Sequence, residues 1–106
     1  MNNKKIMAYP PHVGEILKEE FLEPYNLSIS KFAHLIGVDR AYMSKIINGN
    51  AGVSPAMALR LSKAFGVSVD LWLNLQKAYD LFDAEQKTDL SKVQIIINPN
   101  LEKQLI

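Results

Sequence analysis

Several side chains that can bind nucleic acid lie close together in the stretch Arg40–Lys45. Arg40 and Lys45 can donate hydrogen bonds to guanine edges or to phosphate, and the position of each on its element decides which. Tyr42 offers a ring face to a thymine methyl group and a hydroxyl to phosphate, and Ser44 is small enough to let a backbone approach closely. These residue types predict an element that reads base edges in a DNA groove.

The surrounding stretch ISKFAHLIGVDRAYMSKIIN, residues 29–48, has the pattern of a helix-turn-helix. Ala33 is small and lies in the middle of a first short helix, Gly37 follows where the chain must turn, and Met43 and Ile46 give the apolar spacing of a second helix. Such a motif crosses two helices at roughly 90–120° and excludes a large side chain at the contact, which is the role expected of Ala33. The alternative is an ordinary helical hairpin in a small helical core.

The candidate DNA contacts are the outward side chains of the second helix and polar residues at or just beyond the two ends of the motif. They are Ser30, Lys31, Arg40, Ala41, Tyr42, Ser44, Lys45, Asn48 and Asn50. Tyr42 and Lys45 are the foremost base readers, whereas the serine, lysine and asparagines outside the second helix are expected to reach phosphate. For each of them, a surface position without a DNA contact is the alternative. Arg60 and Lys63 are expected to be solvated charges.

Positive charge gathers around this motif although the whole chain has a net charge of only +1. Residues 28–67 hold Lys31, Arg40, Lys45, Arg60 and Lys63 against the single acid Asp39, a balance of +4. The segments on either side have balances of −1 and −2. Attraction to phosphate requires such a local patch and not a basic whole, and the acidic flanks should point away from DNA.

Length and composition fit one compact domain. A chain of 106 residues with 48% hydrophobic content can form a single core. No apolar run approaches the ~18–20 residues of a membrane span, and the first residues lack the pattern of a secretory signal. There is no cysteine, which excludes disulfides, thiolate metal sites and a cysteine nucleophile. We therefore expect a cytoplasmic protein.

Neither a metal site nor catalysis is expected from the few residues that could support them. His12 and His34 are the two histidines, and no second ligand accompanies either at a metal-binding spacing. Ser44 with His34 could be imagined as a nucleophile and its base, but no third group orients them. The sequence predicts no cofactor and no enzymatic activity.

Helix signals divide the chain into an N-terminal arm at residues 1–12, a helical domain at 13–86 and a tail at 87–106. Five helices are expected, at about 13–23, 28–37, 40–48, 55–65 and 69–86. Serine or aspartate precedes the last four of these, and a glycine follows three of them. The segment Val93–Ile97 is β-branched and bounded by polar residues, which predicts a short strand. The expected fold is all-α, with this strand added.

The last helix and the tail are candidates for contact with a second chain. Leucines and an alanine extend the apolar stripe of the helix over much of its circumference, more than one small domain can cover. A lone strand must also pair with a copy of itself or with a partner's sheet edge; a collapsed or disordered tail is the alternative. The candidate dimer contacts are Leu73, Leu81, Val93, Ile95 and Ile97.

Three segments together resemble a particular family. They are PPHVGEIL at residues 10–17, NGNAGVSPAMALRL at 48–61 and LWLNLQKAYDL at 71–81. In this order and at these distances they are similar to the HigA-type antitoxins, also called virulence-associated protein I, of the phage-repressor-like helix-turn-helix superfamily. The resemblance covers about residues 9–85; Val13 stands where the family commonly has proline.

This resemblance implies a five-helix, lambda-repressor-like domain in a homodimeric antitoxin. Such a protein binds a HigB-type toxin, a ribosome-dependent mRNA endonuclease, and neutralises it by protein contact. It also represses its own operon by binding double-stranded operator DNA. A stand-alone helix-turn-helix regulator without a toxin is the first alternative, and a protein-interaction module that has lost DNA contact is the second.

Overall fold

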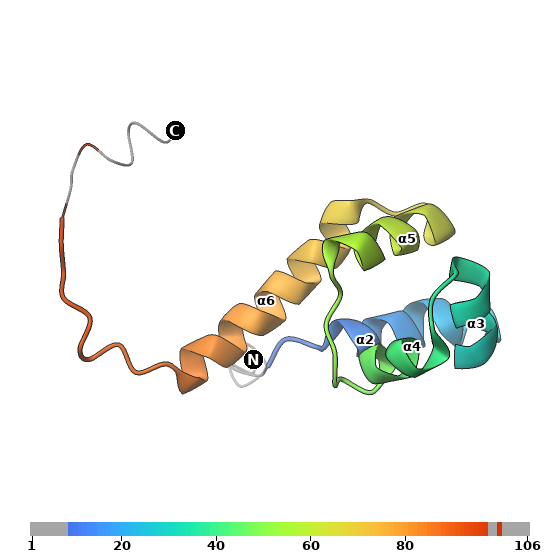
Figure 1. Ribbon diagram of the computed structural model, residues 1–106, viewed down its shortest axis with the longest axis horizontal. Helices are drawn as coiled ribbons and strands as arrows, with labels where there is room; N and C mark the ends of the chain where they lie inside the picture. Colours follow the sequence, from blue (N-terminus) through green and yellow to red (C-terminus); the bar gives the residue numbers. More distant parts are fainter. Residues whose placement is uncertain (1–8, 98–99, 101–106) are drawn as a thin grey trace, which may run out of the picture.

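The computed structural model describes residues 9–97 and residue 100. Its elements are α2 (Val13–Ile16), the π-helix η1 (Leu17–Leu22), α3 (Ile29–Ile36), α4 (Arg40–Ile47), α5 (Pro55–Phe65) and α6 (Val69–Lys87). All regular structure in this part of the chain is helical, which confirms the all-α prediction. Helix α2 and η1 lie beside α3 and α4, and the long α6 leads away from this group (Figure 1).

The four later helices begin at the side chains that the sequence indicated. The side-chain oxygens of Ser28, Asp39, Ser54 and Ser68 each accept a hydrogen bond from the backbone N–H three residues further on, at 3.0–3.2 Å. Gly37 and Gly66 end α3 and α5 in the left-handed region, with φ of 73° and 69°. Local capping therefore fixes the bounds of these helices.

The first helix differs from the single α-helix expected over residues 13–23. Only Val13–Ile16 is α-helical, and Leu17–Leu22 forms a π-helix. In a π-helix the backbone N–H bonds to the carbonyl five residues back, so side chains five apart come close to one face. This places Leu17 and Leu22 both in the core, with 0% and 2% of their surface exposed. A regular α-helix would turn one of the two away.

The core lies between the short helices and the first half of α6. Its buried members are Val13, Leu17, Leu22, Phe32, Ala33, Met43, Ile46, Ile47, Val53, Met57, Ala58, Leu61 and Trp72. Phe21 and Phe65 pack beside the Trp72 ring, with ring centroids 5.1 and 6.5 Å from it. Trp72 is fully buried, which confirms that it belongs to the core.

The predicted strand at residues 93–97 is wrong for the single chain. The described tail forms no strand there, and it runs away from the far end of α6 (Figure 1). Val93, Ile95, Ile96 and Ile97 are 64–89% exposed. A β-branched segment becomes a strand only when a neighbour satisfies its backbone hydrogen bonds, and no neighbouring segment of the described chain does so.

Helix α6 reaches one residue beyond the predicted bound. Lys87 in its last turn lies 2.9 Å from the Asp83 carboxylate, one turn earlier. The hydrogen bond from Lys87 to this carboxylate, together with the negative charge of the carboxylate, raises the pKa of the lysine.

None of the described helices has the length and apolar character needed to span a membrane.

Candidate nucleic-acid interface

The turn between α3 and α4 is closed by hydrogen bonds to the end of α3. The N–H of Val38 donates to the carbonyl of Ala33 at 3.0 Å, and the N–H of Gly37 donates to that of His34 at 3.2 Å. This pair of bonds is a Schellman motif, which needs a left-handed residue at the position of Gly37. Ala33 is 1% exposed, in agreement with the small, buried residue predicted for the helix crossing. The two helices form the helix-turn-helix.

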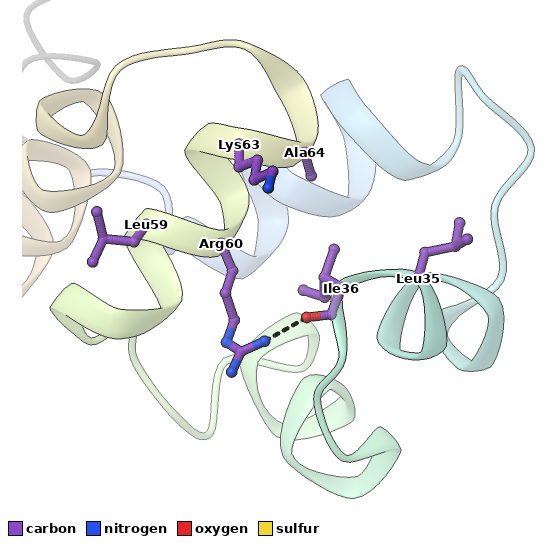
Figure 2. Close-up of a pocket in the computed structure, with 6 residues that line it drawn as sticks. All are labelled: Leu35, Ile36, Leu59, Arg60, Lys63 and Ala64. Atoms are coloured by element: carbon purple, nitrogen blue, oxygen red, sulfur yellow. Dashed lines mark hydrogen bonds between the residues drawn. The ribbon is translucent and has the colours of Figure 1, made fainter.

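A side chain from α5 holds the same turn from outside. The Arg60 guanidinium donates to the carbonyl oxygen of Ile36 at 2.7 Å and to that of Gly37 at 3.4 Å. Figure 2 shows Arg60 reaching from α5 to the end of α3. A cation at the C-terminal end of a helix also interacts favourably with the helix dipole. Arg60 is exposed, as expected of a solvated charge, and it also donates hydrogen bonds that hold this turn.

One face of α4 is buried and the opposite face is open. Met43 and Ile46 are fully buried and Ile47 is 9% exposed. Arg40, Ala41 and Lys45 are exposed on the other side. The hydrophobic side of α4 thus fixes which polar side chains face outward.

Helix α2 packs against the backbone of α4 at Gly14, where there is no room for a Cβ atom. A Cβ atom added to Gly14 would lie 1.8 Å from the carbonyl oxygen of Ile46. Real Cβ contacts are never this short, and the atom is backbone, so it cannot move without α4. His12 caps α2, because its Nδ1 accepts a 2.9 Å hydrogen bond from the N–H of Gly14. Helix α2, capped by His12, therefore helps to set the position of α4.

Polar side chains order the exposed face of the motif. The Nε of Arg40 donates to the Ser30 hydroxyl on α3 at 2.6 Å, which links the N-terminal ends of the two helices. The Asn48 amide donates to the Ser44 hydroxyl at 3.2 Å. No described acid except Asp39 lies between Ser28 and Val67 in the chain, and Asp39 caps α4. The face therefore offers mainly hydrogen-bond donors and positive charge, the chemistry that phosphate and guanine edges accept.

The comparisons with known proteins agree with this geometry. A helix-turn-helix family model, HTH_3, matches residues 18–72, about half of the chain. The chain belongs to this helix-turn-helix family. Antitoxin HigA-1 of Vibrio cholerae is 39% identical over 84 residues, which cover 79% of this chain and 79% of the relative. The uncharacterised HTH-type transcriptional regulator YbaQ of Escherichia coli K12 is 44% identical over 82 residues, covering 77% and 73%.

A solved structure of a relative contains DNA. The antitoxin HigA of Pseudomonas aeruginosa, solved with the higBA promoter, superposes with a TM-score of 0.74 and 34% identity. The match covers 87% of this chain and 99% of that one. The resemblance to HigA-type antitoxins is thereby confirmed, and this chain is a DNA-binding regulator of that type.

Most of the candidate DNA contacts lie on the surface and gather around α4. Those exposed are Ser30, Lys31, Arg40, Ala41, Lys45, Asn48 and Asn50. Ser44 is half-buried. Tyr42 is also half-buried: its ring packs against the core, and its hydroxyl lies 3.5 Å from the carbonyl oxygen of Gly52. Tyr42 thus offers less free surface than Lys45 does.

The candidate dimer contacts divide into two groups. Leu73 is half-buried and packs against the chain's own core. Leu81 is 57% exposed, and Val93, Ile95 and Ile97 are 64%, 85% and 79% exposed. The described chain leaves each residue of the second group open to solvent.

Gln76 and Gly14 are the residues that the sequence did not single out. Gln76 accepts a 2.7 Å hydrogen bond from the N–H of Val53, in the loop that follows α4. Gly14 packs against the backbone of α4 at Ile46. Both belong to the segments that carry the family resemblance, and that was the one available signal of their importance.

Proposed function

We propose that this protein is the antitoxin of a type II toxin–antitoxin system that represses its own operon. The observation that carries the proposal is the exposed, donor-rich face of α4 within the +4 stretch. It is supported by an antitoxin relative and by a promoter-bound relative of the same fold. The chain itself performs no chemistry in this role, since an antitoxin of this kind acts by protein contact.

On DNA, α4 would enter the major groove with its exposed face forward. Arg40, Ala41, Ser44 and Lys45 are then the groups nearest the base edges, with Tyr42 at their margin. The bond from Arg40 to Ser30 limits the directions in which the guanidinium can point. Ser30, Lys31, Asn48 and Asn50 flank this face, where they would reach phosphates on either side of the groove.

Binding to an operator of two half-sites would require a homodimer. The half-sites of such dimers lie about 34 Å apart, one turn of the double helix. Leu81 and the exposed apolar residues of the tail are the surface that a second copy would cover. Leu73 lies on α6 itself and packs against the core of its own chain, so it would contribute by holding this helix in place.

Neutralisation of a HigB-type toxin is the second half of the proposal. It is tested by expressing this chain together with the product of a neighbouring toxin-sized reading frame. A stable complex, and growth arrest by the toxin that this chain relieves, are expected. Relief of arrest without a complex contradicts neutralisation by contact.

A stand-alone transcriptional regulator is the alternative, favoured by the similarity to the HTH-type regulator YbaQ. Under that alternative, no adjacent toxin exists, but the upstream DNA is still bound. A shift assay on this DNA at increasing salt separates both roles from a pure interaction module. Affinity that falls steeply with salt indicates contact with phosphates, and affinity that ignores salt contradicts it.

A further inference from the structure

One peptide unit in the loop after α4 is held from two sides. Its carbonyl oxygen, that of Gly52, lies 3.5 Å from the donating hydroxyl of Tyr42 on α4. Its N–H, that of Val53, donates to the side-chain oxygen of Gln76 on α6 at 2.7 Å. The peptide therefore connects the DNA-facing helix with the longest helix of the fold.

The amide of Gln76 fits against this loop closely. A Cβ on Gly52 would lie 2.8–2.9 Å from three atoms of the Gln76 amide, so with any other residue at position 52 this amide would have to shift. The other end of the amide donates to the Asp80 carboxylate at 2.9 Å, one turn along α6. This second bond fixes the orientation of the amide, since the carboxylate accepts only from the NH₂ group and thus directs the oxygen toward Val53.

The loop that Gln76 holds contains groups that face the DNA in the proposed binding mode. Asn48 and Asn50 are exposed, whereas the side chain of Val53 is 5% exposed. The N–H of Asn50 donates to the carbonyl of Lys45 at 2.7 Å, so the loop continues directly from the end of α4. A shift of the Gly52–Val53 peptide would move these asparagines and loosen Tyr42.

We propose that Gln76 is a positioning residue for DNA binding, acting through the Gly52–Val53 peptide on the loop that carries Asn48 and Asn50. Gln76 itself touches no DNA in this role. The proposal rests on the proposed DNA-binding face and adds to it a side chain 23 positions away from the loop in sequence. It also gives Tyr42 a second role, since its hydroxyl holds the other end of the same peptide.

The test replaces Gln76 by methionine, which keeps the length of the side chain but has no amide. The affinity for duplex DNA from upstream of the chain's own reading frame is measured at fixed salt. We expect a fall of about five- to tenfold, the effect of losing one well-placed hydrogen bond. Helical content by circular dichroism should be unchanged, and the Val53 amide should exchange its hydrogen faster. The matched control is Gln86→Met, at an exposed glutamine on the same helix.

A reversed pair of side chains provides the rescue. In the double variant Gln76→Glu/Asp80→Asn, the carboxylate can accept from both the Val53 N–H and the new amide, so the loop is held again. We expect near wild-type affinity from this variant, and a greater loss from Gln76→Glu alone, where two carboxylates would repel each other.

Three outcomes overturn the inference. They are wild-type affinity in Gln76→Met, a double variant that binds no better than Gln76→Met, and failure of Gln76→Met to fold. The last outcome would make Gln76 a structural residue only. The proposed function fails in a different way, because then the wild-type chain itself does not bind the upstream DNA.

Discussion

At the scale of single residues, the position of α4 depends on residues that lie outside its exposed face. Gly14 lets α2 approach the backbone of α4, and Arg60 holds the end of α3 through two carbonyl oxygens. Gln76 holds the loop that follows α4 by accepting a hydrogen bond from the N–H of Val53. The exposed face of α4 thus consists of few residues, and residues elsewhere in the sequence hold it in place.

Replacing Gly14 by alanine should destabilise the protein. The new Cβ would lie 1.8 Å from the Ile46 carbonyl oxygen, so α2 and α4 must move apart. Overpacking of this kind costs about 1–3 kcal/mol. For a domain of this size each kcal/mol lowers Tm by roughly 4–8 °C. Thermal unfolding of Gly14→Ala is compared with that of Glu15→Ala, an exposed neighbour, and an equal Tm in the two would contradict the contact.

At the scale of helices, capping explains why the bounds of α3 to α6 could be predicted. The signals are local: Ser28, Asp39, Ser54 and Ser68 each bond within the first turn of their own helix. The π-helix could not be predicted in this way. The π-helix brings Leu17 and Leu22 together into the core, and their burial depends on packing against the rest of the fold.

The element-level role of Arg60 is tested by Arg60→Met. This variant keeps the apolar stem of the side chain and removes the donors to Ile36 and Gly37. Since the side chain is exposed, water can replace part of the interaction, and we expect a loss of about 0.5–1 kcal/mol. Urea unfolding measures it, with Lys63→Met on the same helix as the control. A midpoint no lower than that of the control would show that the turn does not need this arginine.

The sequence alone could not predict the contacts between distant parts of the chain that hold the candidate site. The exposed positions of α4 follow from the helical period alone, and most of the predicted contacts are indeed on the surface. Arg60 and Gln76 bond to backbone 24 and 23 positions away, so their partners could not be identified before the fold was known. Tyr42 was placed among the outward residues, yet its ring also packs on the core.

At the scale of the whole molecule, the positive charge and the longest run of exposed apolar residues lie in different parts of the chain. The +4 stretch contains the helix-turn-helix and two exposed leucines, Leu35 and Leu59, while Leu81, Leu90, Val93, Ile95, Ile96 and Ile97 lie on the later part of α6 and on the tail. We expect a second chain to cover these later residues. The strand predicted at residues 93–97 does not form, because the described chain offers this segment no second strand with which to pair.

Removal of residues 88–106 should therefore abolish dimerisation and leave the helical domain folded. The described residues of the tail contribute nothing to the core, so the far-ultraviolet circular dichroism per helical residue should be preserved. Sedimentation equilibrium of the full chain and of the shortened chain measures the change. A shortened chain that is still a dimer would place the interface on the helices alone.

The most direct measurement of the central claim is the affinity for upstream DNA of the variant Arg40→Ala/Lys45→Ala. Its matched control, Lys77→Ala/Lys92→Ala, removes the same charge from exposed positions outside the helix-turn-helix. If the exposed face of α4 reads the operator, the first variant loses specific binding with unchanged helical content. The control should keep nearly all of its affinity. Specific binding by the first variant at wild-type strength would contradict the assignment of this face as the DNA reader.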